Sequence, residues 1–239
     1  MRLIVAQWRM ELAALVRNYE QLLLVVVIPV GVLLFFGNVD VLPDGFGLDR
    51  VVSSVLALSV MSTAMVSTGI ATGFERSYNV LKRLGATPLG RNRLVWAKAA
   101  AVATIEVAQA VLIVVVASFM GWSPTDSSWW QVTAAMLLGT AAFAGIGLSL
   151  AGRLRAEVNL AAQNGLYLVL LAVGGVIVPA DELPGAMGNM ARWLPSGALS
   201  EVLHSSLTPI AGSPNAWLVV VAWAAVMPVV AARIFRFDG

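Results

Sequence analysis

The chain has 239 residues, of which 59% are hydrophobic and 12% charged, and its mean hydropathy is +0.85. Apolar residues make up about half of a soluble domain, so this composition excludes an ordinary soluble protein. The chain contains no cysteine, which excludes disulfides, thiolate nucleophiles and thiolate metal sites.

Several apolar runs are long enough to cross a membrane as helices, which takes about 20 mostly apolar residues. They lack the alternation of a membrane barrel, and an isolated strand cannot satisfy its backbone hydrogen bonds in lipid. We therefore predict an all-α membrane protein with a single transmembrane domain over 1–239. The six predicted spans are about 21–37, 51–73, 97–120, 130–151, 159–178 and 215–233.

Residues 1–20, before the first span, have an amphipathic pattern: apolar residues recur at helical spacing and charged residues fall on the other side. An amphipathic helix with a Trp and basic residues lies in the membrane interface instead of crossing the bilayer. We predict such a helix over 1–20, with a simple anchor for the first span as the alternative. The apolar residues are Val5, Trp8, Leu12, Leu15, Val16 and Tyr19, and the charged ones are Arg2, Arg9, Glu11 and Arg17.

The segment 74–96, between the second and third spans, is rich in basic residues and carries Gly85 and Gly90 at the spacing of a phosphate-binding loop. A working loop needs Lys and then Ser or Thr after the second glycine, but here Arg and Asn follow it. Pro88 also removes a backbone amide that would bind phosphate. This segment therefore does not predict a nucleotide site.

The same segment instead predicts a short helix over 77–84. Tyr78, Leu81 and Leu84 would share one side of it, and Gly85 would end it as a C-terminal cap.

Polar residues inside the spans are candidates for function. Glu106 lies two turns inside the third span, where an ionised carboxylate facing lipid costs about 2.5 kcal/mol or more. It is either a functional group of the bundle interior or a partly interfacial residue bonded to Gln109 or to a neighbouring Arg. Asn159, Gln163 and Asn164 begin the fifth span, and they either form interhelical hydrogen bonds or line a pathway.

The segment 179–214 is long for a loop without structure of its own. It predicts two short helices, separated at Pro195, that dip back toward the outer leaflet before the last span. His204 lies one turn after Ser200, but a catalytic pair also needs an orienting group and an oxyanion site. A single His gives no metal site either. We predict no catalytic and no metal-binding residue.

Basic residues are distributed unevenly between the two sides of this topology. If the N-terminus is inside, all Lys and Arg except Arg50 and Arg192 fall on the inner side. Basic residues beside short loops face the cytoplasm, so we predict that both termini are cytoplasmic.

Taken together, the interfacial helix, the spans, the basic helical loop and the outer helices resemble the permease subunit of bacterial type-2 ABC exporters. The most specific part is the loop after the second span, which reads Glu75-Arg76, a short helix, Thr87-Pro88 and a basic region ending at Lys98. The stretch LPSGALSEVLH is similar to the outer element that precedes the last span in that family. The resemblance implies that 74–96 is a coupling loop docking on the ATP-binding subunit, through Glu75, Arg76, Tyr78, Leu81, Leu84, Thr87 and Pro88.

The resemblance also implies the partners. An ABC ATPase subunit on a separate chain would bind ATP and Mg²⁺, so this chain would bind no cofactor and would not be an enzyme. A second permease subunit, the same or similar, and the lipid bilayer of the bacterial cytoplasmic membrane would be its other partners, with no nucleic acid. The cargo would be a hydrophobic or amphipathic substrate moved outward. The alternative is an ATP-independent, proton-coupled carrier that uses Glu106.

Overall fold

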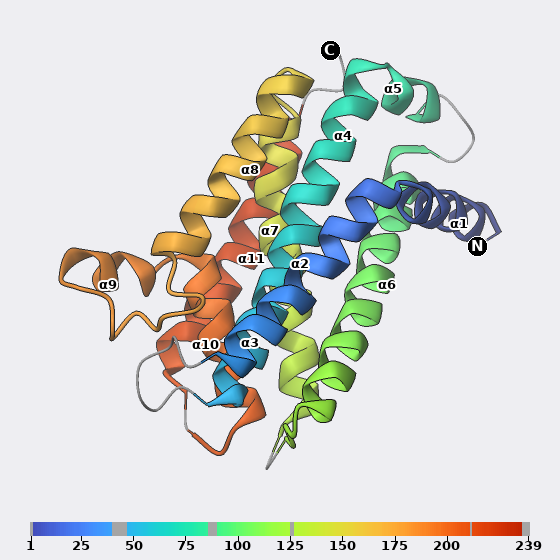
Figure 1. Ribbon diagram of the computed structural model, residues 1–239. Coiled ribbons are helices and arrows are strands. Elements are labelled where there is room, and N and C mark those ends of the chain that lie inside the picture. The colour runs from blue at the N-terminus through green and yellow to red at the C-terminus, as the bar shows by residue number, and fades with distance from the viewer. Residues whose placement is uncertain (1, 40–46, 86–89, 125–126, 211, 236–239) are drawn as a thin grey trace.

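The computed structural model describes residues 2–39, 47–85, 90–124, 127–210 and 212–235 (Figure 1). Within these ranges the regular elements are helices, with no strand. They are α1 Arg2–Arg17, α2 Tyr19–Asn38, α3 Leu48–Val60, the π-helical η1 Met61–Ser67, α4 Thr68–Ser77, α5 Val80–Gly85, α6 Gly90–Phe119, α7 Trp129–Ala151, α8 Ala156–Val173, α9 Ala186–Ala191, α10 Pro195–Leu207 and α11 Pro214–Ile234.

In the part of the chain that the structure describes, five helical stretches are long and apolar enough to cross a membrane, and the predicted all-helical class is confirmed at that level. A shorter apolar helix, Val25–Asn38, comes from α2. The five long stretches are Leu48–Ser77, Val95–Phe119, Trp129–Ala151, Ala156–Val173 and Pro214–Ile234.

The helix of the fifth predicted span ends earlier than its apolar run. We expected helix to 178, but α8 stops at Val173. Gly174 caps it, and Gly175 has a φ of 72°, a left-handed conformation that glycine adopts without strain. The apolar residues that follow therefore turn back toward α10 and do not extend the span.

The continuous stretch α3–η1–α4 forms the centre of the bundle, and most of its side chains are buried. Small residues let neighbouring helices approach it closely, as expected where lipid provides no hydrophobic driving force between helices. Gly147 of α7 is one case, because a Cβ there would lie 2.6 Å from the carbonyl oxygen of Met65.

The helix α1 lies across α6 and carries apolar side chains on its exposed side (Figure 1). Trp8 Nε1 donates to Thr104 Oγ1 of α6 at 3.1 Å. Glu11, which the amphipathic pattern assigned to the solvent side, faces α6 instead, because it pairs there with Lys98. The exposed apolar residues of α1 are Leu3, Val5, Met10 and Val16.

The short helices α5 and α10 lie toward opposite ends of the bundle (Figure 1). The C-terminal end of α11 lies near α5, with α1 beside it; we call this region the α5 end and the opposite one the α10 end. The segment 179–214 contains two short helices, α9 and α10, and Pro195 occupies the first turn of α10. Helix α10 packs against α3, α7 and α11, and Leu199, Leu203 and Leu207 are fully buried.

Candidate functional site

The predicted coupling helix is shorter than expected, because α4 continues through Ser77 before the chain turns. Asn79 makes this turn with a φ of 58°, the left-handed region that Asn tolerates better than most residues. Helix α5 then begins at Val80. Tyr78 therefore lies in the turn and is 68% exposed, so it does not share one helical face with Leu81 and Leu84.

The apolar side of α5 faces this chain's own C-terminal segment. Leu81 is only 3% exposed, and it forms a small cluster with Leu84 and Phe235. Direct docking of Leu81 on the ATP-binding subunit does not fit this geometry, because the side chain is already buried within the chain. The side chains of Lys82 and Arg83 are exposed on the same helix.

Arg76 holds the base of α5 to the loop between α7 and α8. Its Nη1 donates to the carbonyl oxygen of Gly152 at 2.9 Å, and its Nη2 donates to that of Leu154 at 2.6 Å. Arg153 in the same loop donates through Nε to the carbonyl oxygen of Ile234 at 3.1 Å. The loop therefore connects the end of α4 with the C-terminal end of α11.

Glu75 belongs to an ion cluster that joins three helices. Lys98 Nζ of α6 lies 2.7 Å from Glu75 Oε1 of α4 and 2.8 Å from Glu11 Oε2 of α1. All three side chains are at least three-quarters buried, so these contacts are screened less than surface pairs. Glu75 thus fixes the end of α4 to α6 and α1. Thr87 and Pro88, the other residues predicted to dock, lie outside the described residues.

Glu106 of α6 is buried, and the residue is 3% exposed. Its Oε2 is in hydrogen-bond contact with Thr140 Oγ1 of α7. Among the described residues, neither Gln109 nor an Arg binds it, unlike in the interfacial alternative. Gln109 Nε2 donates to the carbonyl oxygen of Val25, and Gln109 Oε1 accepts from Thr63.

Asn159 and Gln163 are fully buried and bond across helices. Asn159 Nδ2 donates to the carbonyl oxygen of Gly69 at 2.9 Å, and Gln163 Nε2 donates to that of Gly147 at 2.8 Å. Of the two alternatives for this pair, the geometry within the chain fits interhelical hydrogen bonding. Asn164 is exposed, and its amide donates to Leu160 of its own helix.

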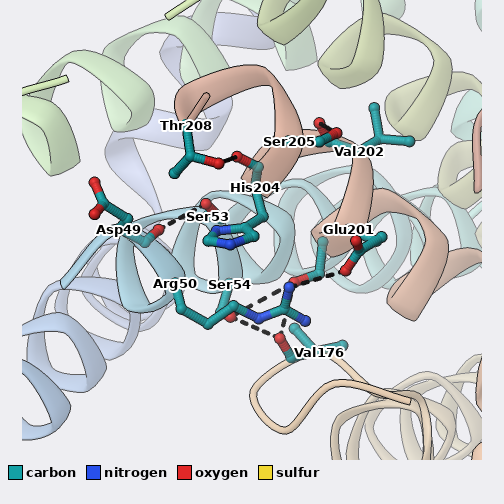
Figure 2. Close-up of polar contacts among 11 residues, drawn as sticks. Asp49, Arg50, Ser53, Ser54, Val176, Glu201, Val202, His204, Ser205 and Thr208 are labelled. Atoms are coloured by element: carbon teal, nitrogen blue, oxygen red, sulfur yellow. Dashed lines mark hydrogen bonds and ion pairs between the residues drawn. The ribbon is translucent and has the colours of Figure 1, made fainter. Parts of the chain in front are cut away.

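Arg50 and Glu201 form an ion pair at the α10 end that sequence reasoning did not anticipate (Figure 2). Arg50 of α3 is 6% exposed, and its Nη1 lies 3.0 Å from Oε2 of Glu201 in α10. Both residues line a cavity of about 400 Å³ whose other walls include Asp181, Arg192 and Trp193. The positions are far apart in sequence, and no local spacing pairs them.

Among the described residues, Ser200 bonds to a backbone carbonyl and not to His204. Ser200 Oγ donates to the carbonyl oxygen of Val176 at 2.8 Å. Ser54 Oγ donates to the same oxygen at 2.6 Å (Figure 2). Burial lowers the pKa of His204, and the positive charge of Arg50 lowers it further, although nearby carboxylates oppose the shift.

Comparison with known proteins identifies the family. The family model described as "ABC-2 type transporter" matches residues 2–207. The chain belongs to the ABC-2 type transporter family. A protein named "Putative transport permease YvfS" from Bacillus subtilis (strain 168) is 24% identical over 190 residues, which cover 78% of each chain.

The matched range runs from the start of α1 to the last residue of α10, so it includes the short helices α5, α9 and α10. Family membership makes this chain a multi-pass membrane permease, which has no ATPase activity and binds no cofactor itself. An ABC-2 permease works with an ABC ATPase subunit. The family match confirms the resemblance found in the sequence at the level of the family.

Proposed function

We propose that this permease moves a hydrophobic or amphipathic substrate outward across the bacterial cytoplasmic membrane, driven by a separate ATPase subunit. The observation that carries the proposal is the family match over 2–207. The apolar composition of the long helices supports a hydrophobic or amphipathic cargo, because such a substrate can enter from the bilayer.

We propose that both termini are cytoplasmic and that the α5 end faces the cytoplasm. The charge distribution supports this orientation, because cytoplasmic loops carry an excess of Lys and Arg. Basic residues lie along α1, in α5, in the loop after α7 and in the last turn of α11. Acidic residues outnumber basic ones around α9 and α10.

The α5 end is proposed as the docking surface for the ATPase, with two separate roles for its residues. Leu81, Leu84 and Arg76 attach α5 to the rest of the chain, whereas Tyr78 and the outer side of α5 are available to a partner. Glu75 fixes the preceding helix end through Lys98. A displacement of the ATPase would then be transmitted to α4, to α6 and to the C-terminal end of α11. Thr87 and Pro88 stay part of the proposed docking loop.

A second permease subunit, either another copy or a similar chain, is proposed to complete the pathway. The polar residues considered for the pathway support this: Asn159 and Gln163 are committed to hydrogen bonds inside one chain. A pathway between two chains, lined by surfaces that a single chain exposes, fits this geometry better.

Co-purification tests the proposal directly. A tagged copy expressed in its native host should retain an ABC ATPase, and inverted membrane vesicles should accumulate amphipathic substrate only with ATP and Mg²⁺. Accumulation driven by a proton gradient without ATP would instead favour the carrier that uses Glu106.

Crosslinking in native membranes should capture a pair of permease chains, and a monomer that still transports would contradict the dimer.

A further inference from the structure

Glu106 lies where an ionised carboxylate would have no balancing charge. It is next to the midpoint of the apolar stretch Val95–Phe119, and its side chain is buried. Thr140 of α7 contacts it, and neither α7 nor η1, which also packs on α6, contains a titratable residue. On α6 the nearest charged group is Lys98, about 12 Å away along the helix axis, and its ammonium group is bound to Glu11 and Glu75.

The other elements that pack on α6 carry their charged residues near the ends of the bundle. Helix α3 has Asp49 and Arg50 at the α10 end, and α1, α5 and the start of α2 have theirs at the α5 end. No cation is therefore placed at the depth of Glu106 in the part of the chain that the structure describes.

The hydrogen bonds of Thr140 indicate the protonation state of Glu106. Thr140 Oγ1 is in contact with two oxygens: the carbonyl oxygen of Met136, at 2.8 Å, and Glu106 Oε2. A hydroxyl has a single hydrogen to donate. If Glu106 were ionised, both neighbours would be pure acceptors, and one of the two contacts would have no hydrogen. If Glu106 is protonated, its O–H donates to Thr140, and Thr140 donates to Met136.

The second carboxyl oxygen agrees with this assignment. Glu106 Oε1 is buried and has no hydrogen-bond partner among the described residues. Leaving an oxygen unpartnered costs far less in a neutral acid than in an ionised carboxylate, because burying an uncompensated charge carries the largest penalty.

We propose that Glu106 is a proton-binding site in the middle of the membrane, a neutral carboxylic acid that donates a hydrogen bond to Thr140. The site connects two helices with different main partners: α6 packs chiefly on α1 and α3, and α7 chiefly on α11, α10 and η1. The inference concerns the resting protein and does not depend on the transported substrate or on its direction.

Infrared spectroscopy of the full chain reconstituted in lipid at neutral pH tests the proposal. A protonated carboxyl has a C=O stretching band that an ionised carboxylate lacks. We expect such a band in the wild-type protein and its loss in Glu106→Gln, which keeps the size and polarity of the neutral acid. The matched control is Glu201→Gln, which should leave the band in place because Glu201 is paired with Arg50. Absence of the band from the wild-type protein would overturn the proposal.

A second variant tests the bond itself and does not require Glu106→Gln to fold. Thr140→Val has nearly the same shape but cannot accept the hydrogen bond, so the band should persist and shift to higher frequency. Thr133→Val on the same helix is the control, because its hydroxyl is exposed and donates to the carbonyl oxygen of Trp129 in its own helix. A band that does not move in Thr140→Val would show that Glu106 does not donate to Thr140.

Discussion

Two short helices, α5 and α10, interrupt the pattern of long spans, and they are attached to the bundle in opposite ways. Helix α10 has 13 residues, and its buried side chains contact α3, α7 and α11. Helix α5 has six residues and is held by a small apolar cluster and by polar contacts at its base. The first is part of the core, whereas the second is an appended element that a partner could move.

This comparison predicts that substitutions in α10 change the stability of the fold, whereas substitutions in α5 change coupling to the ATPase. The charged cluster around Lys98 is the place where the comparison could fail, since it lies at the α5 end and yet is mostly buried.

The largest effect is therefore expected for Lys98→Met. Removing the ammonium group leaves Glu11 and Glu75 as neighbouring buried carboxylates without their cation, which costs about 3–5 kcal/mol. Thermal unfolding in detergent should show a large loss of stability. Arg83→Met, an exposed change at the same end, is the control and should unfold like the wild type. Equal stability of the two variants would mean that the cluster is not structural.

The next largest effect is expected for Leu203→Ala in α10. Leu203 is fully buried, and truncating such a side chain costs about 3 kcal/mol through lost packing. Leu218→Ala in α11 is the matched control, because Leu218 is 67% exposed. The two unfolding temperatures should differ clearly. If they coincide, α10 is not part of the core.

A smaller effect, on coupling instead of folding, is expected for Phe235→Ala. Without Phe235, Leu81 and Leu84 lose their contact within the chain, and α5 becomes less ordered. We expect ATPase capture to weaken about tenfold, equivalent to about 1.4 kcal/mol, with little change in the unfolding temperature.

The double variant of Phe235→Ala with Leu81→Ala should bind the ATPase no more weakly than the weaker-binding of the two single variants, because both changes remove the same contact. Phe119→Ala, an exposed residue outside this cluster, is the control. If Leu81→Ala abolishes capture while Phe235→Ala has no effect, Leu81 contacts the ATPase directly and the attachment role is wrong.

The smallest effect is expected from acid at the α10 end. Because the pKa of His204 is lowered in the folded protein, its neutral form is the one that folding favours. That stabilisation is complete above the unfolded pKa of about 6.5 and decreases as the pH falls below it, since the unfolded chain takes up the proton first. His204→Gln removes the only histidine, so it should reduce the loss of stability between neutral and mildly acidic pH. An unchanged pH profile would assign that loss to other groups.

The pairing of Asn159 and Gln163 with α4 and α7 was partly predictable from the sequence. Gly69 and Gly73 are spaced by four residues, as Asn159 and Gln163 are, and such matching periods allow polar side chains to lie over glycines. A Cβ at Gly73 would lie 2.4 Å from Asn159 Nδ2, so the glycine makes room for the amide. The partner atoms themselves are backbone carbonyls, which every residue has, and therefore the sequence contains no signal for them.

By itself, the sequence determined the all-helical class, the long apolar helices and the positions of α9 and α10. These follow from local composition: apolar runs of sufficient length must form helices in lipid, and Pro195 marks the start of α10. The end of α8 at Val173 was not predicted, because the apolar run continues past it. It also determined the resemblance to the family that the match over 2–207 confirms.

Only the tertiary structure decided which side of each short helix is buried and which charges meet. Glu11 looked like a solvent-side residue until Lys98 and Glu75 were placed beside it, and Leu81 looked available to a partner until Phe235 was placed against it. Helical periodicity assigns side chains to a face, but it does not say what covers that face. That depends on chain segments distant in sequence, whose approach is set by the packing of the whole bundle.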